Sequence, residues 1–321
     1  MSFVINIREF AKKSDWVTHY YRCTRDWVTN CYRRIRSSFR SILYRLSPTL
    51  LSTNRYKMIM GARPNLNDPQ SFNEKLLWLM FYWRHPLKTR CADKYAVRDY
   101  VKEHGLEHIL NELLGVYENS SEIYFKSLPQ RFVLKCTHGC GFNIVCNDKS
   151  SLNVEETCRK LDAWMKVDYS KIYGESHYAR IKRRIICEAY LNDLTSDLPT
   201  DYKIYCFDGK AHCTRICTER TSNGPAKYDI YDREWNQLPY LRTSLLVNRF
   251  IPKPAGYEEM IEAAEKLSKP FPFVRVDFYN ISGKVVFGEM TFTPYACTGN
   301  IYTDDARYVL GSLLRLPAKR L

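Results

Sequence analysis

The sequence predicts an α+β protein, because β-hairpins and amphipathic helices follow one another along its 321 residues. Two pairs of apolar runs, 201–207 with 211–217 and 273–279 with 284–291, are each joined by a short polar turn containing glycine, which is typical of a hairpin. Residues 154–165 place Leu161 and other apolar side chains at helical spacing. A chain of this length can form two or three cores with a cleft between them.

Two carboxylates interrupt the apolar strands of the last hairpin, Asp277 and Glu289. A buried carboxylate is costly unless it is paired or binds a cation, and carboxylates on neighbouring strands can meet across a sheet. One interpretation is therefore a site for a hard divalent cation, Mg²⁺ or Mn²⁺. The alternative is a carboxylate that faces solvent and forms one salt bridge with Arg275.

The composition favours an anionic partner, because the formal net charge is +14 and the sequence pI is near 9.2. No recognition helix or RNP motif accompanies this charge, so we expect no nucleic-acid partner. The twelve cysteines lack zinc-ligand spacing and no secretory signal is recognisable, which favours reduced thiols and a cytoplasmic location. No apolar run reaches the roughly 18 residues that a membrane-spanning helix requires.

The first 50 residues are strongly basic, with ten Lys and Arg against three acidic residues. Apolar side chains from Trp16 to Leu46 recur at steps of three and four, which predicts one long helix over 15–46. Two interpretations stay open. A basic amphipathic helix with interfacial Trp and Tyr can lie on an anionic membrane at the inner face, or the same helix can dock on the protein's own core.

Helix signals continue after this segment. Ser47-Pro48 is interpreted as the end of the basic helix, and Ser71 with Glu74 forms a capping box before a new apolar run. Asp93 is the expected N-cap of a helix that reaches about His104, which places Lys94 in its first turn. A lysine there is electrostatically unfavourable, because the helix dipole favours anions at the N-terminus.

Two further charged residues lie in apolar strands. Lys135 belongs to the run 132–136, which a glycine-containing loop joins to a second run at 143–146. Glu188 lies within the strand-like run 183–191. A lysine inside an apolar strand needs an anion to meet, and backbone N–H groups of a glycine-containing loop can bind phosphate.

These motifs, taken in order, resemble the ATP-grasp fold. More narrowly, SFNEKLLWL, ADKYAVR, FVLKCTHGCG, DYKIYCFDGK and FPFVRVDFYNISGKVVFGEMTFTP are similar to the TupA-like ATP-grasp family, named for teichuronopeptide biosynthesis. The resemblance covers roughly residues 55–315. It implies two α+β subdomains that grip ATP in a cleft, with the basic N-terminal helix added. The expected division is 1–50 (basic helix), 51–115 (helical region), 116–191 (first subdomain) and 192–321 (second subdomain with the metal site).

The resemblance also implies a role for individual positions. Phosphate contacts are expected from Lys94 and Lys135, beneath a loop that contains His138, Gly139 and Gly141. Glu188 would hold ribose or adenine, and the backbone of Ala189, Tyr190 and Leu191 would read the adenine edge. The implied metal ligands are Asp277, Glu289 and Thr291, where Thr291 departs from the Asn of the wider superfamily. The implied catalytic cations are Lys203, Arg220 and Arg275.

The implied reaction is ATP-dependent ligation of a carboxylate to an amine through an acyl phosphate, with Mg²⁺ or Mn²⁺. The expected partners are an acidic glycan or lipid-linked saccharide and an amine substrate. Two other functions are alternatives to this ligase reaction. A glycosyltransferase would require an Asp-x-Asp metal motif after a strand, which the sequence lacks, and a membrane adaptor using the basic helix would leave Asp277 and Glu289 unexplained.

Overall fold

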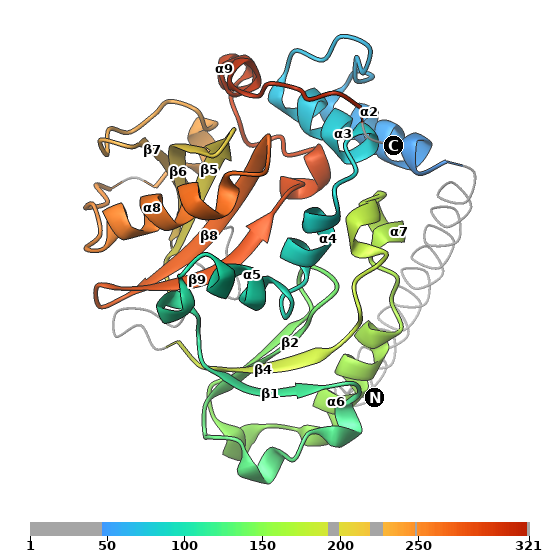
Figure 1. The fold of residues 1–321 in the computed structure, drawn as a ribbon, viewed down its shortest axis with the longest axis vertical. Coiled ribbons are helices and arrows are strands. Elements are labelled where there is room, and N and C mark those ends of the chain that lie inside the picture. Colours follow the sequence, from blue (N-terminus) through green and yellow to red (C-terminus); the bar gives the residue numbers. More distant parts are fainter. Residues whose placement is uncertain (1–46, 192–198, 219–226, 248, 320–321) are drawn as a thin grey trace, which may run out of the picture.

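Two antiparallel sheets organise the computed structural model, which describes residues 47–191, 199–218, 227–247 and 249–319 (Figure 1). The small sheet has the order β1-β4-β2-β3 and contains β1 (Leu113–Tyr117), β2 (Phe132–Cys136), β3 (Asn143–Cys146) and β4 (Ile185–Ala189). The large sheet has the order β7-β6-β5-β8-β9 and contains β5 (Asp201–Phe207), β6 (Lys210–Thr218), β7 (Lys227–Asp232), β8 (Phe273–Ile281) and β9 (Lys284–Thr291).

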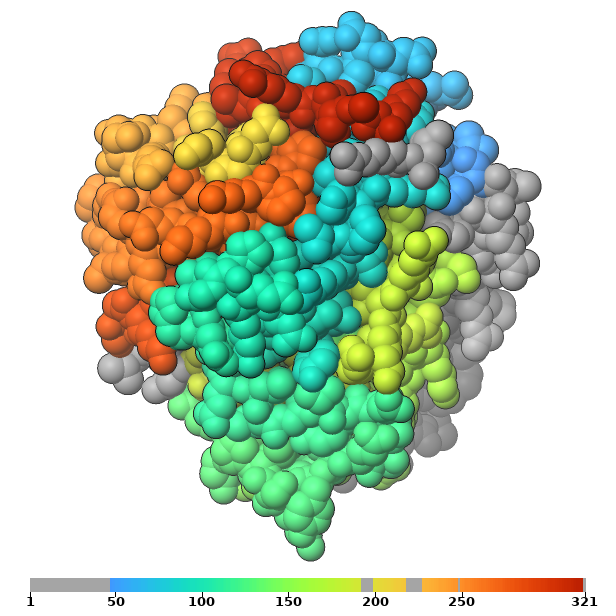
Figure 2. Space-filling model, viewed as in Figure 1, coloured from blue at the N-terminus to red at the C-terminus, as the bar shows by residue number. Residues whose placement is uncertain are grey.

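Helices cover and connect the sheets. They are α2 (Pro48–Met60), α3 (Phe72–Tyr82), α4 (Pro86–Ala92), α5 (Val97–Glu103), α6 (Val154–Met165), α7 (Ser170–Tyr173), α8 (Tyr257–Ser268) and α9 (Asp304–Leu313). Helix α8 packs against β5, β6 and β8, and α6 packs against β2. We call each sheet, with the helices packed on it, a lobe: the small lobe contains the small sheet and the large lobe the large sheet. Helices α4 and α5 lie between the two sheets, and in the space-filling view this part of the chain fills the front between the two lobes (Figures 1 and 2).

The larger core joins the large sheet to the helical region. Phe72, at the start of α3, is fully buried, and its ring meets Phe273 edge-on with 5.1 Å between centroids and Tyr302 at 5.8 Å. Such edge-to-face pairs are favourable for aromatic rings. A second core lies under the small sheet, where Leu134 and Phe132 pack with Leu161 of α6. Each sheet therefore has its own apolar support, and the helical region is fastened to the large sheet.

Local patterns predicted many elements correctly. The bounds of β2, β3, β5, α6 and β9 are those expected, the last hairpin forms, and the capping box before α3 is complete. Ser47-Pro48 begins helix α2, because the Ser47 hydroxyl caps it and Pro48 occupies its first position. Its role as the end of the basic helix stays a prediction, because that helix lies outside the described residues. One expectation was wrong. Asp93 ends α4, and α5 begins only at Val97, so Lys94 lies in the connection between them.

Several elements carry weak local signals and were not expected, among them β1, β7, α4 and α9. The predicted basic helix over 15–46 lies outside the described residues. The division of the chain at residues 50, 115 and 191 stays a prediction, although β1 crosses the second of these positions to pair with β4. Among the described residues, no helix has both the length and the hydrophobicity that crossing a membrane would take.

The capping box gives a test of this part of the fold. Glu74 N donates to the Ser71 hydroxyl, and a Glu74 carboxylate oxygen accepts from Ser71 N at 3.1 Å. We expect Ser71→Ala to lower the free energy of unfolding by about 1 kcal/mol, measured by urea unfolding. Ser71→Thr keeps a capping hydroxyl and should lose less. An alanine variant with the wild-type urea midpoint would show that α3 is held by packing alone.

Candidate active site

A row of four charged residues crosses four strands of the large sheet. In the strand register Arg215 of β6 lies opposite Lys203 of β5, Lys203 lies opposite Asp277 of β8, and Asp277 lies opposite Glu289 of β9. Because side chains alternate between the faces of a strand, residues at matched positions point to the same face. The large sheet therefore presents two cations and two carboxylates side by side on one surface.

Asp277 is the most enclosed member of this row, with 1% of its surface exposed. Arg275 Nε donates to Asp277 Oδ1 and Arg275 Nη2 to Oδ2, both at 2.6 Å, and Lys203 Nζ donates to Oδ2 at 2.8 Å. Burial alone would raise the pKa of the Asp277 carboxyl, but Arg275 and Lys203 outweigh it and hold that pKa below its usual range. Asp277 is thus an ionised carboxylate clamped by two cations, which is the predicted salt bridge to Arg275 in a buried setting.

Glu289 and Thr291 complete the predicted metal set on β9. Thr291 Oγ1 donates to Glu289 Oε1 at 3.1 Å and accepts from Arg275 Nη2 at 3.0 Å. The other oxygen of Glu289, Oε2, lies 3.8 Å from Lys94 Nζ. The Glu289 side chain is about one-third exposed, so this carboxylate, unlike Asp277, opens to the surrounding space.

Lys94 joins the two lobes at this point. Its Nζ donates to the carbonyl oxygen of Gly139 at 2.7 Å, and the same atom faces Glu289 on the large sheet. Gly139 belongs to the glycine-containing loop between β2 and β3, and an added Cβ there would lie 2.6 Å from the Tyr169 ring. A larger residue at Gly139 would therefore displace the tyrosine that packs beneath this loop.

A cavity of 500 Å³ lies over the charged row. Its walls include Lys203, Arg215, Arg275 and Glu289 from the large sheet and Cys140 from the glycine-containing loop. The remaining described lining residues are Arg55, Tyr169, Tyr173, Glu175, Tyr178, Asp201, Cys217, Tyr228, Thr291, Thr293, Tyr295 and Ala296. The cavity is bounded by both lobes. It contains two of the three predicted catalytic cations, Lys203 and Arg275, together with two predicted metal ligands, Glu289 and Thr291.

The segment after β9 is strained where it closes this cavity. Three consecutive non-glycine residues, Tyr295, Ala296 and Cys297, have φ angles of 54°, 51° and 63°. Each such conformation costs on the order of 1 kcal/mol or more and needs external support. Asn73 of α3 supplies it, because Asn73 Nδ2 donates to the carbonyl oxygens of Cys297 at 3.1 Å and Gly299 at 3.3 Å.

Arg215 is a site residue that the sequence analysis did not single out. It is 2% exposed, and its Nη1 donates to the Tyr295 hydroxyl at 3.0 Å, with its guanidinium over the Tyr228 and Tyr295 rings at 5.3 and 5.1 Å. No carboxylate of the described residues pairs with Arg215, and its Nε has no partner there. A buried cation in a cavity wall that meets aromatic rings and no carboxylate among the described residues is suited to an anionic ligand.

Lys135 and Glu188 meet on the small sheet. Lys135 Nζ donates to Glu188 Oε2 at 2.6 Å across β2 and β4, and Arg98 of α5 lies 3.3 Å from Oε1. Arg98 belongs to the motif ADKYAVR, but the sequence analysis assigned it no separate role. It also donates to the carbonyl oxygen of Asn111 at 2.6 Å. The structure thus brings the two predicted nucleotide residues together, and Arg98 makes the cluster net positive.

The other predicted nucleotide residues occupy different positions. His138 lies in the core of the small lobe, with its Nε2 3.2 Å from the carbonyl oxygen of Trp164, and it does not line the cavity. Burial lowers the pKa of His138, so its ring is neutral at pH 7. Gly141 turns the loop at a φ of 77°. Its open surroundings leave this part of the loop free to approach a ligand.

Ala189 and Tyr190 line a different cavity of 450 Å³ at the end of β4, together with Arg131, which lies 4.1 Å from the centre of the Tyr190 ring. The Ala189 N–H donates to the carbonyl oxygen of Glu112 at 3.0 Å, so that group is already used by the fold. Leu191 is half-buried at the edge of the described residues. Arg220 lies outside them, and its predicted role stays a prediction.

The donor set at the charged row fits a hard divalent cation. Asp277 Oδ1 accepts one hydrogen bond and can use a second lone pair, and Glu289 Oε2 lies beyond hydrogen-bond distance of Lys94. Mg²⁺ at nucleotide sites is held by one or two carboxylates together with phosphate oxygens and water. No group of three or more His, Cys, Asp or Glu side chains suited to a metal occurs among the described residues.

Comparison with known proteins identifies the family. The sequence profile described as TupA-like ATPgrasp matches residues 74–315, about three-quarters of the chain. The chain belongs to the TupA-like ATP-grasp family. The expected ATP-grasp fold is confirmed by this membership, and the two antiparallel sheets with mixed helices agree with it. A search of curated proteins returned no match.

Solved structures of ATP-grasp ligases are similar to this member of the family at low identity. An L-amino acid ligase from Bacillus licheniformis is 16% identical, with 72% of this chain and 52% of that chain covered and a TM-score of 0.45. A D-alanine–D-alanine ligase from Bacillus anthracis complexed with ATP is 14% identical, with coverages of 63% and 55% and a TM-score of 0.39. The ATP-grasp ligase PsnB complexed with minimal precursor, Mg and ADP is 11% identical, with coverages of 75% and 64% and a TM-score of 0.39. In these three matches the chain spans between about half and two-thirds of the other protein's length.

Glu175 is an acidic wall residue of the cavity that no motif indicated. It is 4% exposed and accepts a hydrogen bond from the Thr293 hydroxyl. Burial raises the pKa of its carboxyl to about 7, with Thr293 opposing this only in part. Near neutral pH Glu175 therefore exists in both protonation states, unlike the permanently ionised Asp277.

This shifted pKa predicts a pH-dependent stability. The pKa of Glu175 in the folded state lies above its value of about 4.3 in the unfolded state, so the folded state binds the proton more tightly. This proton binding stabilises the folded state fully at pH values below about 4.3. The stabilisation is lost as the pH rises through about 7. Between pH 5 and pH 8, Glu175→Gln should gain roughly 2 to 3 kcal/mol in unfolding free energy relative to wild type. Urea unfolding at both pH values measures this, with Glu262→Gln as an exposed control. Parallel curves for wild type and Glu175→Gln would show that Glu175 does not titrate in this window.

Proposed function

We propose that the protein is an ATP-dependent carboxylate–amine ligase that releases ADP and phosphate. The observation that carries this proposal is the position of Lys94, whose amino group touches the glycine-containing loop and also faces the Glu289 carboxylate on the other lobe. A cation between a phosphate-binding loop and a metal-type carboxylate is what a triphosphate in a cleft requires. Family membership over residues 74–315 supports the same reaction.

The cavity residues, the charged row of the large sheet and the charged residues of the small lobe would each have a part in this reaction. Lys94 and Lys135 would bind nucleotide phosphates, and Arg98 with Glu188 would set the charge around the nucleoside end. Asp277, Glu289 and Thr291 would hold Mg²⁺, which neutralises phosphate charge when bound. Mn²⁺ offers the same ligand preferences. The similar ATP-grasp ligase structures that contain ATP, or Mg with ADP, support this choice of cofactors.

Lys203, Arg275 and Arg215 supply the remaining positive charge. Phosphorylation of a carboxylate and attack by an amine both place negative charge on oxygen atoms in the transition state, and fixed cations in a dry cavity stabilise it. Lys203 lines the cavity, and its amino group contacts Asp277 and Asp201. Burial lowers the pKa of Lys203, but the two carboxylates outweigh it and raise that pKa above its usual value. Arg215 is then the group that can bind the substrate carboxylate. Glu175, with its pKa near 7, is placed in the same cavity to accept a proton from the amine.

The proposed substrates rest on the teichuronopeptide biosynthesis for which the family is named and on the charge of the chain. An acidic glycan or lipid-linked saccharide would supply the carboxylate, and an amino acid or amino sugar the amine, in the synthesis of a teichuronopeptide, capsule or other surface polysaccharide. The net charge of +14 supports an acidic substrate. A cytoplasmic location, with the basic segment 1–50 at the inner membrane face, belongs to this proposal.

The two carboxylates on the last hairpin test the metal site. Asp277→Asn and Glu289→Gln should each reduce Mg²⁺-dependent ADP release on the order of a hundredfold, because the ion loses a charged ligand. The measurement is ADP release beside thermal stability with and without Mg²⁺-ATP. Glu262→Gln, exposed on α8, is the matched control. Wild-type ADP release and wild-type stabilisation by Mg²⁺-ATP in both variants would make the carboxylates structural and remove the chemical centre of the proposal.

Lys135 tests the nucleotide site. Lys135→Met keeps the aliphatic stem and removes the charge, so ATP should bind about ten- to a hundredfold more weakly by calorimetry, through loss of one charge-assisted contact. Lys126→Met, an exposed lysine of the same lobe, is the control. Unchanged ATP affinity would leave Lys135 as the structural partner of Glu188. The same calorimeter with a UDP-sugar separates a ligase from a glycosyltransferase, since only the latter should bind it.

A further inference from the structure

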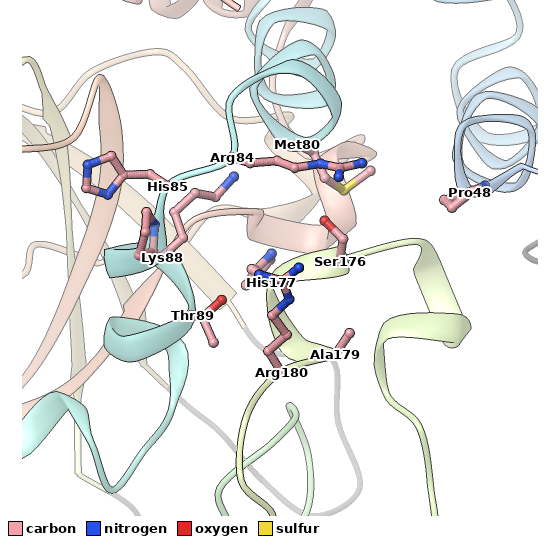
Figure 3. Close-up of a pocket in the computed structure, with 11 residues that line it drawn as sticks. Pro48, Met80, Arg84, His85, Lys88, Thr89, Ser176, His177, Ala179 and Arg180 are labelled. Atoms are coloured by element: carbon pink, nitrogen blue, oxygen red, sulfur yellow. The ribbon is translucent and has the colours of Figure 1, made fainter. Parts of the chain in front are cut away.

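A cavity of 680 Å³ lies apart from the candidate active site and shares no described lining residue with it (Figure 3). Met80 and Arg84 lie on one side of this cavity, and Ser176, His177 and Arg180 lie opposite (Figure 3). Its other described lining residues are Pro48, His85, Pro86, Lys88, Thr89 and Ala179. We call it the rear cavity, because the segment 175–180 separates it from the active-site cavity, which Glu175 and Tyr178 line.

His177 is a buried polar residue of the rear cavity with no partner in the described chain. It is 7% exposed, and neither Nδ1 nor Nε2 has a hydrogen-bond partner among the described residues. Its ring packs against Tyr178 at 4.3 Å and Phe292 at 6.1 Å between centroids. Burial lowers the pKa of His177 well below its usual value, so the ring is neutral and offers one donor and one acceptor. Buried polar atoms are normally satisfied, so a ligand with hydroxyl or oxyanion groups fits this position.

Positive charge lines the rear cavity from both sides. Arg84, beyond the end of α3, and Arg180 are both exposed, and neither forms an ion pair with a described residue. Lys88 adds a third cation, buried beside them. Among the described residues its amino group donates to the carbonyl oxygens of Leu79 at 3.2 Å and Trp83 at 3.3 Å. No acidic side chain occurs among the described lining residues. Guanidinium groups on facing walls suit a carboxylate or a phosphate.

We propose that the rear cavity binds a small anionic molecule that carries hydroxyl groups, of the size of a monosaccharide. Arg84 and Arg180 hold its carboxylate or phosphate, and His177 exchanges hydrogen bonds with a hydroxyl. Met80, Pro48 and Pro86 provide apolar surface for the ring. The volume lies within the range of small-molecule sites. The proposal does not depend on the ligase reaction, because no residue of the active-site cavity takes part in it.

The test observes His177 directly. The seven histidines of the full chain give separate imidazole signals in a nitrogen-15 NMR spectrum, and His177→Gln identifies the signal of His177. Glucuronate, glucose 6-phosphate and neutral glucose are titrated with Mg²⁺ and a non-hydrolysable ATP analogue present, so that anions do not fill the active-site cavity. Arg84→Gln/Arg180→Gln is compared with Arg63→Gln/Arg159→Gln, which removes two exposed arginines elsewhere.

We expect the two acids to shift the His177 signal and glucose to leave it in place. The Arg84→Gln/Arg180→Gln variant should bind at least tenfold more weakly, and the control variant should bind as wild type. The signals of the histidines outside the rear cavity should be unchanged in both variants as proof of folding. Binding of only one acid supports the site and identifies the oxyanion. No shift with either acid, or equal affinity in the two arginine variants, overturns the proposal. Failure of the ATP analogue to bind would count against the ligase proposal alone, because the His177 signal reports only the rear cavity.

Discussion

The buried clamp on Asp277 is the interaction on which the site depends. A carboxylate that is 1% exposed is tolerated only because two cations contact its oxygens, since an unpaired charge at such depth costs several kcal/mol. The clamp exists because β5 and β8 pair in a register that places Lys203 opposite Asp277, while Arg275 lies two residues before Asp277 on the same strand. A slip of one residue would move Asp277 to the face covered by α8, so strand register and site chemistry are specified together.

The candidate active site also depends on the helical region between the lobes. Lys94 contacts the small lobe and faces the large one, and it is placed by the short connection between α4 and α5. Asn73 of α3 supports the strained segment that closes the cavity. Neither sheet alone therefore forms the site. The connection between α4 and α5, two helices that lie between the sheets, supplies the cation that meets both lobes.

The sequence predicted the features whose cause is local. Hairpin turns, alternation and a capping box identified the last hairpin and α3, and charged residues in apolar strands pointed to Asp277 and Glu289. Lys203 was indicated only by the family resemblance. Arg215 also lies in an apolar run, 211–217, but neither the local pattern nor the family motif singled it out. Its importance comes from the register of three strands and from Tyr295, which is 80 residues away in the chain. His138 shows the converse, because a histidine beside glycines looks available to a ligand until α6 and its Trp164 cover it. Strand β1 is likewise defined by a distant partner, β4.

The three consecutive residues after β9 with left-handed backbone conformations lower the stability of the fold but fix the shape of the cavity wall. Glycine adopts such angles at no steric cost, so glycine at Ala296 would relieve the backbone and raise the melting temperature. The same change would loosen Tyr295, whose hydroxyl and ring hold the Arg215 guanidinium in the cavity wall. Selection for thermal tolerance alone would thus lead away from a rigid binding surface. Stabilising substitutions are therefore better placed on the exposed surface, away from this turn.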